Sequence, residues 1–163
     1  MLEKTGVPTK EQVMREFPDE SRINEGPVVV IECYKEIPCN PCTIACKFDA
    51  IHIGEDINKR PKVTEENCIG CSVCLSKCPG LAIMLVDGSK SEEYVHMTIP
   101  YEFYPLPEEG DLVEGLDREG NYLENVKVLK VTNPKSYDRT PLIKLEVSRK
   151  HMYDFRNIRL EGK

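Results

Sequence analysis

The sequence predicts an α+β protein in three consecutive parts. Residues 1–27 form an N-terminal arm with a short helix, residues 28–90 form a cysteine-rich domain, and residues 91–163 form a small antiparallel β domain, either a barrel or a sandwich. Two observations support this division. All eight cysteines lie within residues 33–78, whereas the second half has no cysteine and consists of short alternating runs separated by turn residues.

The N-terminal arm contains one clear helix start. Thr9 and Gln12 have the spacing of a capping box, and the helix that follows ends before Pro18. Val13 and Phe17 lie one turn apart and give this helix an apolar face. An arm of this length cannot fold by itself, so it packs either on its own chain or on a partner subunit.

Apolar and alternating runs predict the strands of the other two parts. They cover residues 28–32, 51–53, 82–86, 95–99, 111–116, 126–131, 141–147 and 157–160. Short helical turns are expected at residues 43–45 and 75–77. Residues 87–91 have the composition of a linker, and Gly120 occupies the left-handed position of a hairpin turn.

The most specific motif is CIGCSVCLSKCP, which runs from Cys68 to Pro79. Its spacing, C-x2-C-x2-C-x3-C-P, is that of thiolate ligands to [4Fe–4S] clusters, and the fourth thiol of such a motif ligates the other cluster where two are present. Gly70 allows the loop to turn tightly between the first two cysteines. A second motif is therefore expected upstream.

A related motif does precede it. Cys39, Cys42 and Cys46 have the spacing C-x2-C-x3-C, which matches the last three positions of the downstream motif. The regular first position is occupied by Glu36, and the nearest thiol, Cys33, lies three residues earlier. The two motifs form an internal repeat of roughly thirty residues, the size of one supersecondary unit.

With this repeat, residues 28–86 resemble a bacterial-type ferredoxin domain with two [4Fe–4S] clusters. The resemblance implies two pseudo-symmetric halves, each with a strand, a cluster loop, a short helix and a return strand. It implies that one cluster is bound by Cys46, Cys68, Cys71 and Cys74, and the other by Cys33, Cys39, Cys42 and Cys78. Lys47 stands where the family usually has proline, and we expect its charge to raise the potential of the nearby cluster. Six apolar side chains are expected to shield the clusters: Ile44, Ile51, Ile69, Val73, Leu75 and Ile83.

The closure of the upstream site has three possible forms. Thiolate is the softer and commoner cubane ligand, which favours Cys33. Glu36 lies at the regular position, and carboxylates also bind iron. The third form is a three-iron cluster without a fourth protein ligand.

Disulfides and zinc are competing interpretations of the cysteines. Residues 1–10 contain no apolar signal-peptide segment, and no run is long enough to span a membrane, so we expect a cytoplasmic protein in which thiols stay reduced. Zinc knuckles also use C-x2-C pairs. Here, however, two runs of three thiols are each followed by a distant fourth, which favours iron–sulfur clusters over zinc.

The charge and the motif content limit the function classes. The net charge of −6 argues against nucleic acid as a partner and suits docking to a basic patch on a redox protein. The sequence shows no serine–histidine–aspartate set, P-loop or GxGxxG motif. We therefore expect a subunit without a catalytic site of its own.

The overall layout also resembles small ferredoxin-like subunits of multi-subunit flavin-dependent dehydrogenases of anaerobes, including those that act on amino acids. Residues 31–42 and the aromatic, proline-rich residues 101–107 carry this resemblance. It implies an electron-transfer subunit that passes single electrons through two clusters to or from flavin-containing dehydrogenase subunits. The alternative is a protein-binding or regulatory module whose clusters are structural or sense oxygen.

Overall fold

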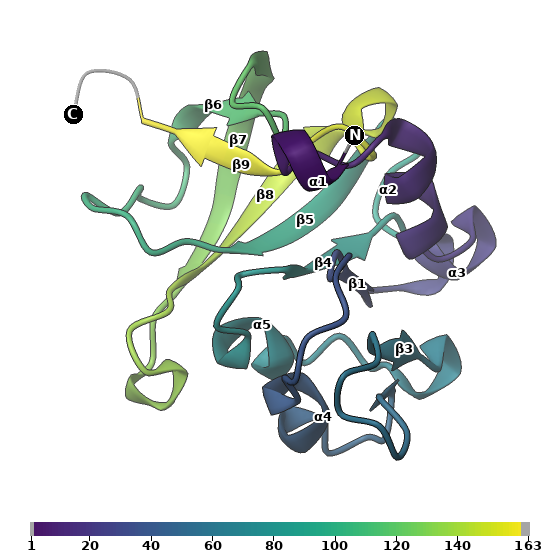
Figure 1. The fold of residues 1–163 in the computed structure, drawn as a ribbon. Helices are drawn as coiled ribbons and strands as arrows, with labels where there is room; N and C mark the ends of the chain where they lie inside the picture. Colours follow the sequence, from purple (N-terminus) through teal and green to yellow (C-terminus); the bar gives the residue numbers. More distant parts are fainter. Residues whose placement is uncertain (1, 161–163) are drawn as a thin grey trace.

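The computed structural model describes residues 2–160 and confirms the α+β class (Figure 1). The helices are α1 (Leu2–Thr5), α2 (Lys10–Glu16), α3 (Glu20–Glu25), α4 (Pro41–Ala45), α5 (Val73–Lys77) and the 3-10 turns η1 (Glu65–Asn67), η2 (Lys135–Tyr137) and η3 (Arg149–His151). The strands are β1 (Val28–Ile31), β2 (Ile51–His52), β3 (Lys62–Val63), β4 (Ile83–Asp87), β5 (Tyr94–Pro100), β6 (Leu112–Leu116), β7 (Tyr122–Thr132), β8 (Leu142–Ser148) and β9 (Asn157–Arg159).

The cysteine-rich part and the C-terminal half share one antiparallel sheet. Its seven strands have the order β1-β4-β5-β8-β7-β6-β9, and β2 and β3 form a separate pair. We expected the second half to form a barrel or sandwich of its own, but its strands extend the sheet that β1 and β4 begin. All five residues of β4 are buried. A buried strand must form hydrogen bonds along both edges, and β5 covers the edge of β4 that β1 leaves open.

The segment expected to be a linker is part of a short connection between β4 and β5, which pair in the same sheet. The backbone N–H of Gly88 donates to the carbonyl of Ile23 at 2.9 Å, and Arg149 donates to the carbonyl of Gly88 at 3.0 Å. A Cβ at residue 88 would lie 2.9 Å from both the Arg149 and the Ile23 side chains. The connection is therefore held against the arm and the C-terminal half, and the sheet continues through it.

Strands β1 and β4 separate two apolar cores. Side chains of one β-strand alternate between the two faces of its sheet. The larger core contains Val28, Val30, Met84 and Val86, and the smaller core contains Val29, Ile31, Ile83 and Leu85. The smaller core also contacts most of the cysteines. In Figure 1, α4 and α5 lie below β1 and β4, and the strands of the C-terminal half, β5 to β9, lie mostly above them.

The N-terminal arm packs on its own chain. The predicted capping box is present, because the Thr9 side chain accepts from the Gln12 N–H and Gln12 accepts from the Thr9 N–H. Val13, Phe17 and Ile23 are buried in the larger core. The ring of Phe17 meets the ring of Tyr153 edge to face, with centroids 5.0 Å apart. Burial in this core explains how so short an arm is ordered.

None of the helices in residues 2–160 has both the length and the apolar character that crossing a membrane requires.

Candidate metal centre

The eight thiols line two separate pockets beside the smaller core. The first pocket is lined by Cys33, Cys39, Cys42 and Cys78. The second pocket is lined by Cys46, Cys68, Cys71 and Cys74. All eight thiols are free of disulfide bonds. Each pocket thus takes three thiols from one end of the segment and one from the opposite motif, which is the grouping that the ferredoxin resemblance implies.

Cys46 and Cys78 each line the pocket of the opposite motif, and they occupy equivalent positions in the two halves. Each is the C-cap of a five-residue helix, with φ and ψ of −81° and 100° at Cys46 and −79° and 110° at Cys78. Four residues later, the N–H of Ala50 donates to the Cys46 sulfur at 3.3 Å, and the N–H of Ala82 donates to the Cys78 sulfur at 3.4 Å. The internal repeat of the sequence is therefore also a repeat of backbone geometry. It directs each capping thiol across the boundary between the halves.

Gly70 meets two requirements of the downstream loop. Its φ is +69°, in the left-handed region that side chains other than glycine disfavour. A Cβ at this position would also lie 2.5 Å from the Cβ of Pro27. The loop between Cys68 and Cys71 can therefore turn tightly at Gly70, as predicted, and it also lies close to Pro27 at the end of the arm.

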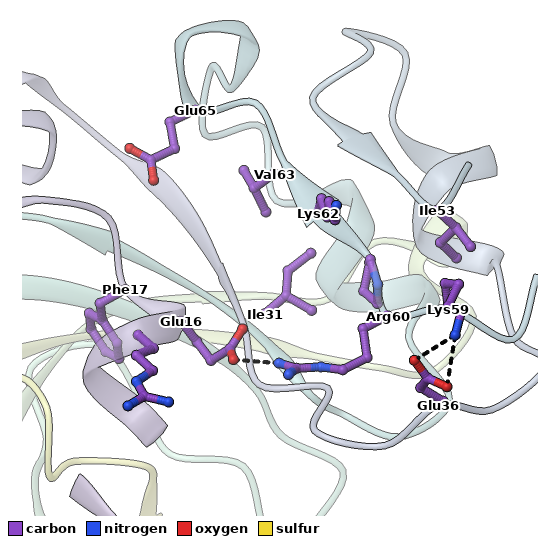
Figure 2. A pocket seen from close by; sticks show the side chains of 12 residues that line it. Glu16, Phe17, Ile31, Glu36, Ile53, Lys59, Arg60, Lys62, Val63 and Glu65 are labelled. Carbon is purple, nitrogen blue, oxygen red and sulfur yellow. Dashed lines mark hydrogen bonds and ion pairs between the residues drawn. The ribbon is translucent and has the colours of Figure 1, made fainter. Parts of the chain in front are cut away.

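The structure separates Cys33 from Glu36. Cys33 lines the first pocket together with three other thiols. Glu36 instead faces a neighbouring polar cavity, where it forms an ion pair of 3.0 Å with Lys59 (Figure 2). Both side chains of that pair are 56% exposed. Of the candidates for closing the upstream site, Cys33 is the one that lies with the other thiols.

Burial and neighbouring thiols raise the pKa of three of the cysteines, Cys33, Cys42 and Cys74. The pKa of Cys74 is raised to about 12, and that of Cys42 to about 11, first by burial and then by neighbouring thiols. Burial, Cys78 and Cys39 also raise the pKa of Cys33. Thiolates grouped in this way need nearby positive charge to form, and iron ions bound to them would supply it. The donor set therefore fits a thiolate-bound cluster.

Four thiols line each pocket, the number of ligands that a [4Fe–4S] cluster needs. Among residues 2–160, no three histidine, cysteine, aspartate or glutamate side chains are grouped closely enough to hold one metal ion. In a [4Fe–4S] cluster, four thiolates surround the cube. Four thiols distributed around a pocket meet that requirement.

Apolar shielding of the pockets is only partly as expected. Ile51, Leu75 and Ile83 are buried in the smaller core, as predicted. Ile44 and Ile69 were also expected to shield the clusters, but they are 76% and 57% exposed. Ile44 lines neither thiol pocket, whereas Ile69 lines the second pocket despite its exposure. The prediction was therefore wrong for Ile44.

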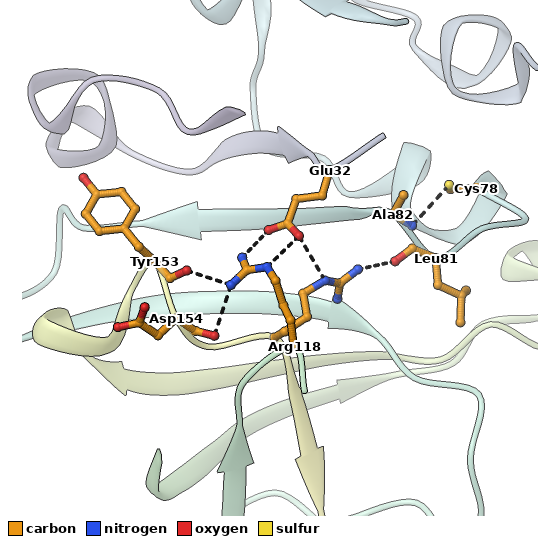
Figure 3. Close-up of polar contacts among 8 residues, drawn as sticks. Glu32, Cys78, Leu81, Ala82, Arg118, Tyr153 and Asp154 are labelled. Atoms are coloured by element: carbon orange, nitrogen blue, oxygen red, sulfur yellow. Dashed lines mark hydrogen bonds and ion pairs between the residues drawn. The ribbon is translucent and has the colours of Figure 1, made fainter. Parts of the chain in front are cut away.

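Several arginines that the sequence analysis did not single out contact the cysteine loops. Arg22 donates to the carbonyl of Cys68 at 2.9 Å, and Arg60 donates to the carbonyl of Cys33 at 2.6 Å. Arg118 forms hydrogen bonds with Glu32, next to Cys33 (Figure 3). The only signal of this contact in the sequence is Glu32 itself, a charged residue directly after an apolar strand.

Comparison with known proteins agrees with this site. Residues 37–90 match the family described as 4Fe-4S dicluster domain, a range that includes seven of the cysteines and begins after Cys33. This match identifies the segment as a 4Fe-4S cluster-binding region. It supports an iron–sulfur protein of the electron-transfer class.

Two curated proteins are similar to parts of the chain. One is a subunit of the Na(+)-translocating ferredoxin:NAD(+) oxidoreductase complex of Acetobacterium woodii. It is 47% identical over 45 residues, which cover 28% of this chain and 13% of that protein. The other is the archaeal-type glutamate synthase [NADPH] of Dehalococcoides mccartyi, which is 37% identical over 49 residues, or 30% of this chain and 10% of that protein. The similarity thus concerns a short segment of each relative. No solved structure matches the chain.

Proposed function

We propose that this chain is an electron-transfer subunit that holds two [4Fe–4S] clusters, one in each thiol pocket. One observation carries the proposal: each pocket collects four thiols, and in each pocket one of the four comes from the opposite cysteine motif. Two cubes need eight thiolate ligands, and the segment offers eight thiols. When bound, each cluster would take up or release one electron at a time.

The residues of the chain would bind and shield the clusters. The ligands of the first cluster would be Cys33, Cys39, Cys42 and Cys78, and those of the second Cys46, Cys68, Cys71 and Cys74. Buried Leu75 and Ile83 limit water near the thiols, and a lower local dielectric is one of the means by which a protein sets cluster potential. Cys71 is exposed, so the second pocket reaches the surface, where an electron could enter or leave.

We further propose that the chain works inside a larger oxidoreductase with a flavin-containing subunit, in a reducing cytoplasm. Both relatives are named as redox enzymes, and one is named as a subunit of a complex. About three fifths of this chain, residues 1–27 and 91–163, lies outside the cysteine-rich part, more than cluster binding requires. Phe103 and Tyr104 are exposed, and aromatic side chains of this kind are enriched at protein interfaces.

The cluster content can be measured directly. The full chain, purified without oxygen, should contain about eight iron and about eight sulfide per chain, as expected for two cubes. Its reduced form should give the electron paramagnetic resonance (EPR) signals of two [4Fe–4S] clusters. About two zinc per chain with negligible sulfide would overturn the proposal.

A second experiment tests whether the chain works inside a larger oxidoreductase. The chain should be isolated from its source without oxygen, together with the proteins that bind it, and the flavin content of that complex measured. Under the proposal, reduction of the flavin by its substrate reduces the clusters of this chain. Clusters that stay oxidised while the flavin of the same complex is reduced would favour the regulatory alternative.

A further inference from the structure

Two arginines of the C-terminal half share one buried glutamate beside the first pocket (Figure 3). Arg118 donates from Nε to Oε2 of Glu32 at 2.9 Å and from Nη2 to Oε1. The Nε of Arg156 lies 3.7 Å from the same Oε2. The side chains of Glu32 and Arg118 are only 6% and 10% exposed. We call these three residues the Arg118–Glu32–Arg156 group.

This group contacts the chain next to two thiols of the first pocket. Glu32 precedes Cys33, and its backbone N–H donates to the carbonyl of Ala82 at 2.8 Å. Arg156 donates from Nη2 to the carbonyl of Leu81. The next residue, Ala82, donates its N–H to the Cys78 sulfur at 3.4 Å. The group is therefore one residue from Cys33 and within a short run of hydrogen bonds from Cys78.

The Arg118–Glu32–Arg156 group carries a net charge of +1. Arginine stays protonated in proteins, including Arg156, whose pKa is lowered mainly by burial. The further bonds of Arg118 go to the carbonyls of Tyr153 and Asp154, at 2.7 and 3.1 Å, which carry no formal charge. Because the group is largely buried, water and salt screen this charge weakly.

Other cations beside the first pocket are either matched by anions or exposed. Arg60 forms an ion pair with Glu16, and Lys59 forms one with Glu36, so each pair adds no net charge. Lys35 also lines the pocket, but it is exposed, and water therefore screens its charge. Within residues 2–160, the buried and uncompensated charge beside this pocket is thus that of the Arg118–Glu32–Arg156 group.

The second pocket has a different electrostatic setting. Arg22 donates to the carbonyls of Cys68, Gly26 and Glu65, at 2.9, 3.2 and 3.3 Å. The carboxylate of Glu65 is close enough for Arg22 to lower its pKa, although burial raises that pKa overall. The positive charge of Arg22 is therefore opposed by a nearby carboxylate. Lys47, next to Cys46, is exposed, and water screens its charge.

We propose that the Arg118–Glu32–Arg156 group raises the reduction potential of the cluster in the first pocket above that of the cluster in the second. Reduction adds one electron to a cluster, and a nearby net positive charge favours the more negative, reduced state. The electron comes from the redox partner, and no bond forms or breaks in the chain. The first cluster is then the preferred electron acceptor within the chain. This inference rests on the proposed function.

The test is a redox titration of the full chain loaded with iron and sulfide under anaerobic conditions. Dithionite is the reductant, and EPR follows each cluster. The signal that disappears in Cys33→Ser identifies the first cluster. In Arg156→Gln, we expect the reduction equilibrium of the first cluster to become about tenfold less favourable, which is about 59 mV for one electron. The second cluster should keep its potential.

Two further variants separate charge from structure. Arg156→Lys keeps the positive charge, so the first cluster should keep a potential close to that of the unchanged chain. Glu32→Gln removes the negative charge, so the potential should move upward, opposite to Arg156→Gln. Arg159→Gln is the matched control, because Arg159 lies in β9, is 56% exposed and pairs with Glu114, outside the Arg118–Glu32–Arg156 group. It should shift neither cluster.

Several results would overturn the inference. One is a potential of the first cluster that Arg156→Gln leaves unchanged. Another is a shift in Arg156→Lys as large as that in Arg156→Gln. A third is a shift of the same size in both clusters of Arg156→Gln. If Arg156→Gln loses iron, the test is the direction in which Glu32→Gln shifts the potential of the first cluster: an upward shift supports the inference, and a downward or absent shift refutes it. The iron and sulfide content of the unchanged chain tests the proposed function separately: two clusters whose potentials ignore these substitutions refute this inference and leave the proposed function intact.

Discussion

Substitution of Cys33 by serine tests how the first pocket is closed. Cys33 lies with Cys39, Cys42 and Cys78 around this pocket, and Glu36 lies outside it. Cys33→Ser leaves three thiols for a cube that needs four ligands. We expect the first cluster to be lost or converted to a three-iron form, whereas Glu36→Gln should leave it intact.

The size of the effect follows from the ligand count. Two intact cubes hold about eight iron atoms. Loss of the first cluster would leave about four, and conversion to a three-iron form would leave about seven. Glu36 forms only an exposed ion pair with Lys59, with both side chains 56% exposed. Such pairs contribute little to stability, so Glu36→Gln should keep the iron content of the unchanged chain.

The assay compares iron, sulfide and EPR spectra of the two variants with those of the unchanged chain, all prepared without oxygen. Glu36→Gln is the matched control, since Glu36 stands at the regular ligand position three residues after Cys33. The reverse pattern, with a damaged cluster in Glu36→Gln and an intact one in Cys33→Ser, would transfer the ligand assignment to Glu36. Two intact four-iron clusters in both variants would refute the reasoning about this pocket.

Three further predictions concern single positions. Cys46→Ser and Cys78→Ser should each damage the cluster carried mainly by the opposite motif, as resolved by EPR; damage confined to the cluster of the same motif would contradict the crossed arrangement. Lys47→Pro should lower the potential of the second cluster slightly, because Lys47 is exposed and water screens its charge; a redox titration without a downward shift would refute this. Gly70→Ala should cost about 1–2 kcal/mol from its left-handed φ, with a further cost from the contact with Pro27, and an unchanged temperature of cluster loss would contradict it.

The cysteine loops could be predicted because their information is local. The spacing of Cys68, Cys71 and Cys74 places three thiols on one loop, and Gly70 provides the turn that this loop needs. The capping box at Thr9 likewise involves residues three positions apart, and it is present. The ligand roles of the eight thiols and the division at residues 27 and 90 stay predictions.

The continuous sheet could not be predicted in the same way. Residues 87–91 are polar and flexible by composition, which is typical of linkers between domains. The same composition also suits a tight turn between paired strands. The deciding factor is whether β4 and β5 form hydrogen bonds. This depends on the burial of β4 by distant segments, α3 of the arm and α5. Alternation along one strand does not reveal its neighbours.

The sequence by itself determined the chemistry of this protein, a set of thiols with the spacing of [4Fe–4S] ligands on short helical loops. Only the tertiary structure decided that Cys33 joins these thiols while Glu36 does not, and that Arg118 meets Glu32 across 86 residues of chain. The physical reason is the distance along the sequence between the residues that interact. Turns, caps and ligand loops depend on residues a few positions apart, whereas buried ion pairs and sheet order depend on which distant segments exclude water from one another.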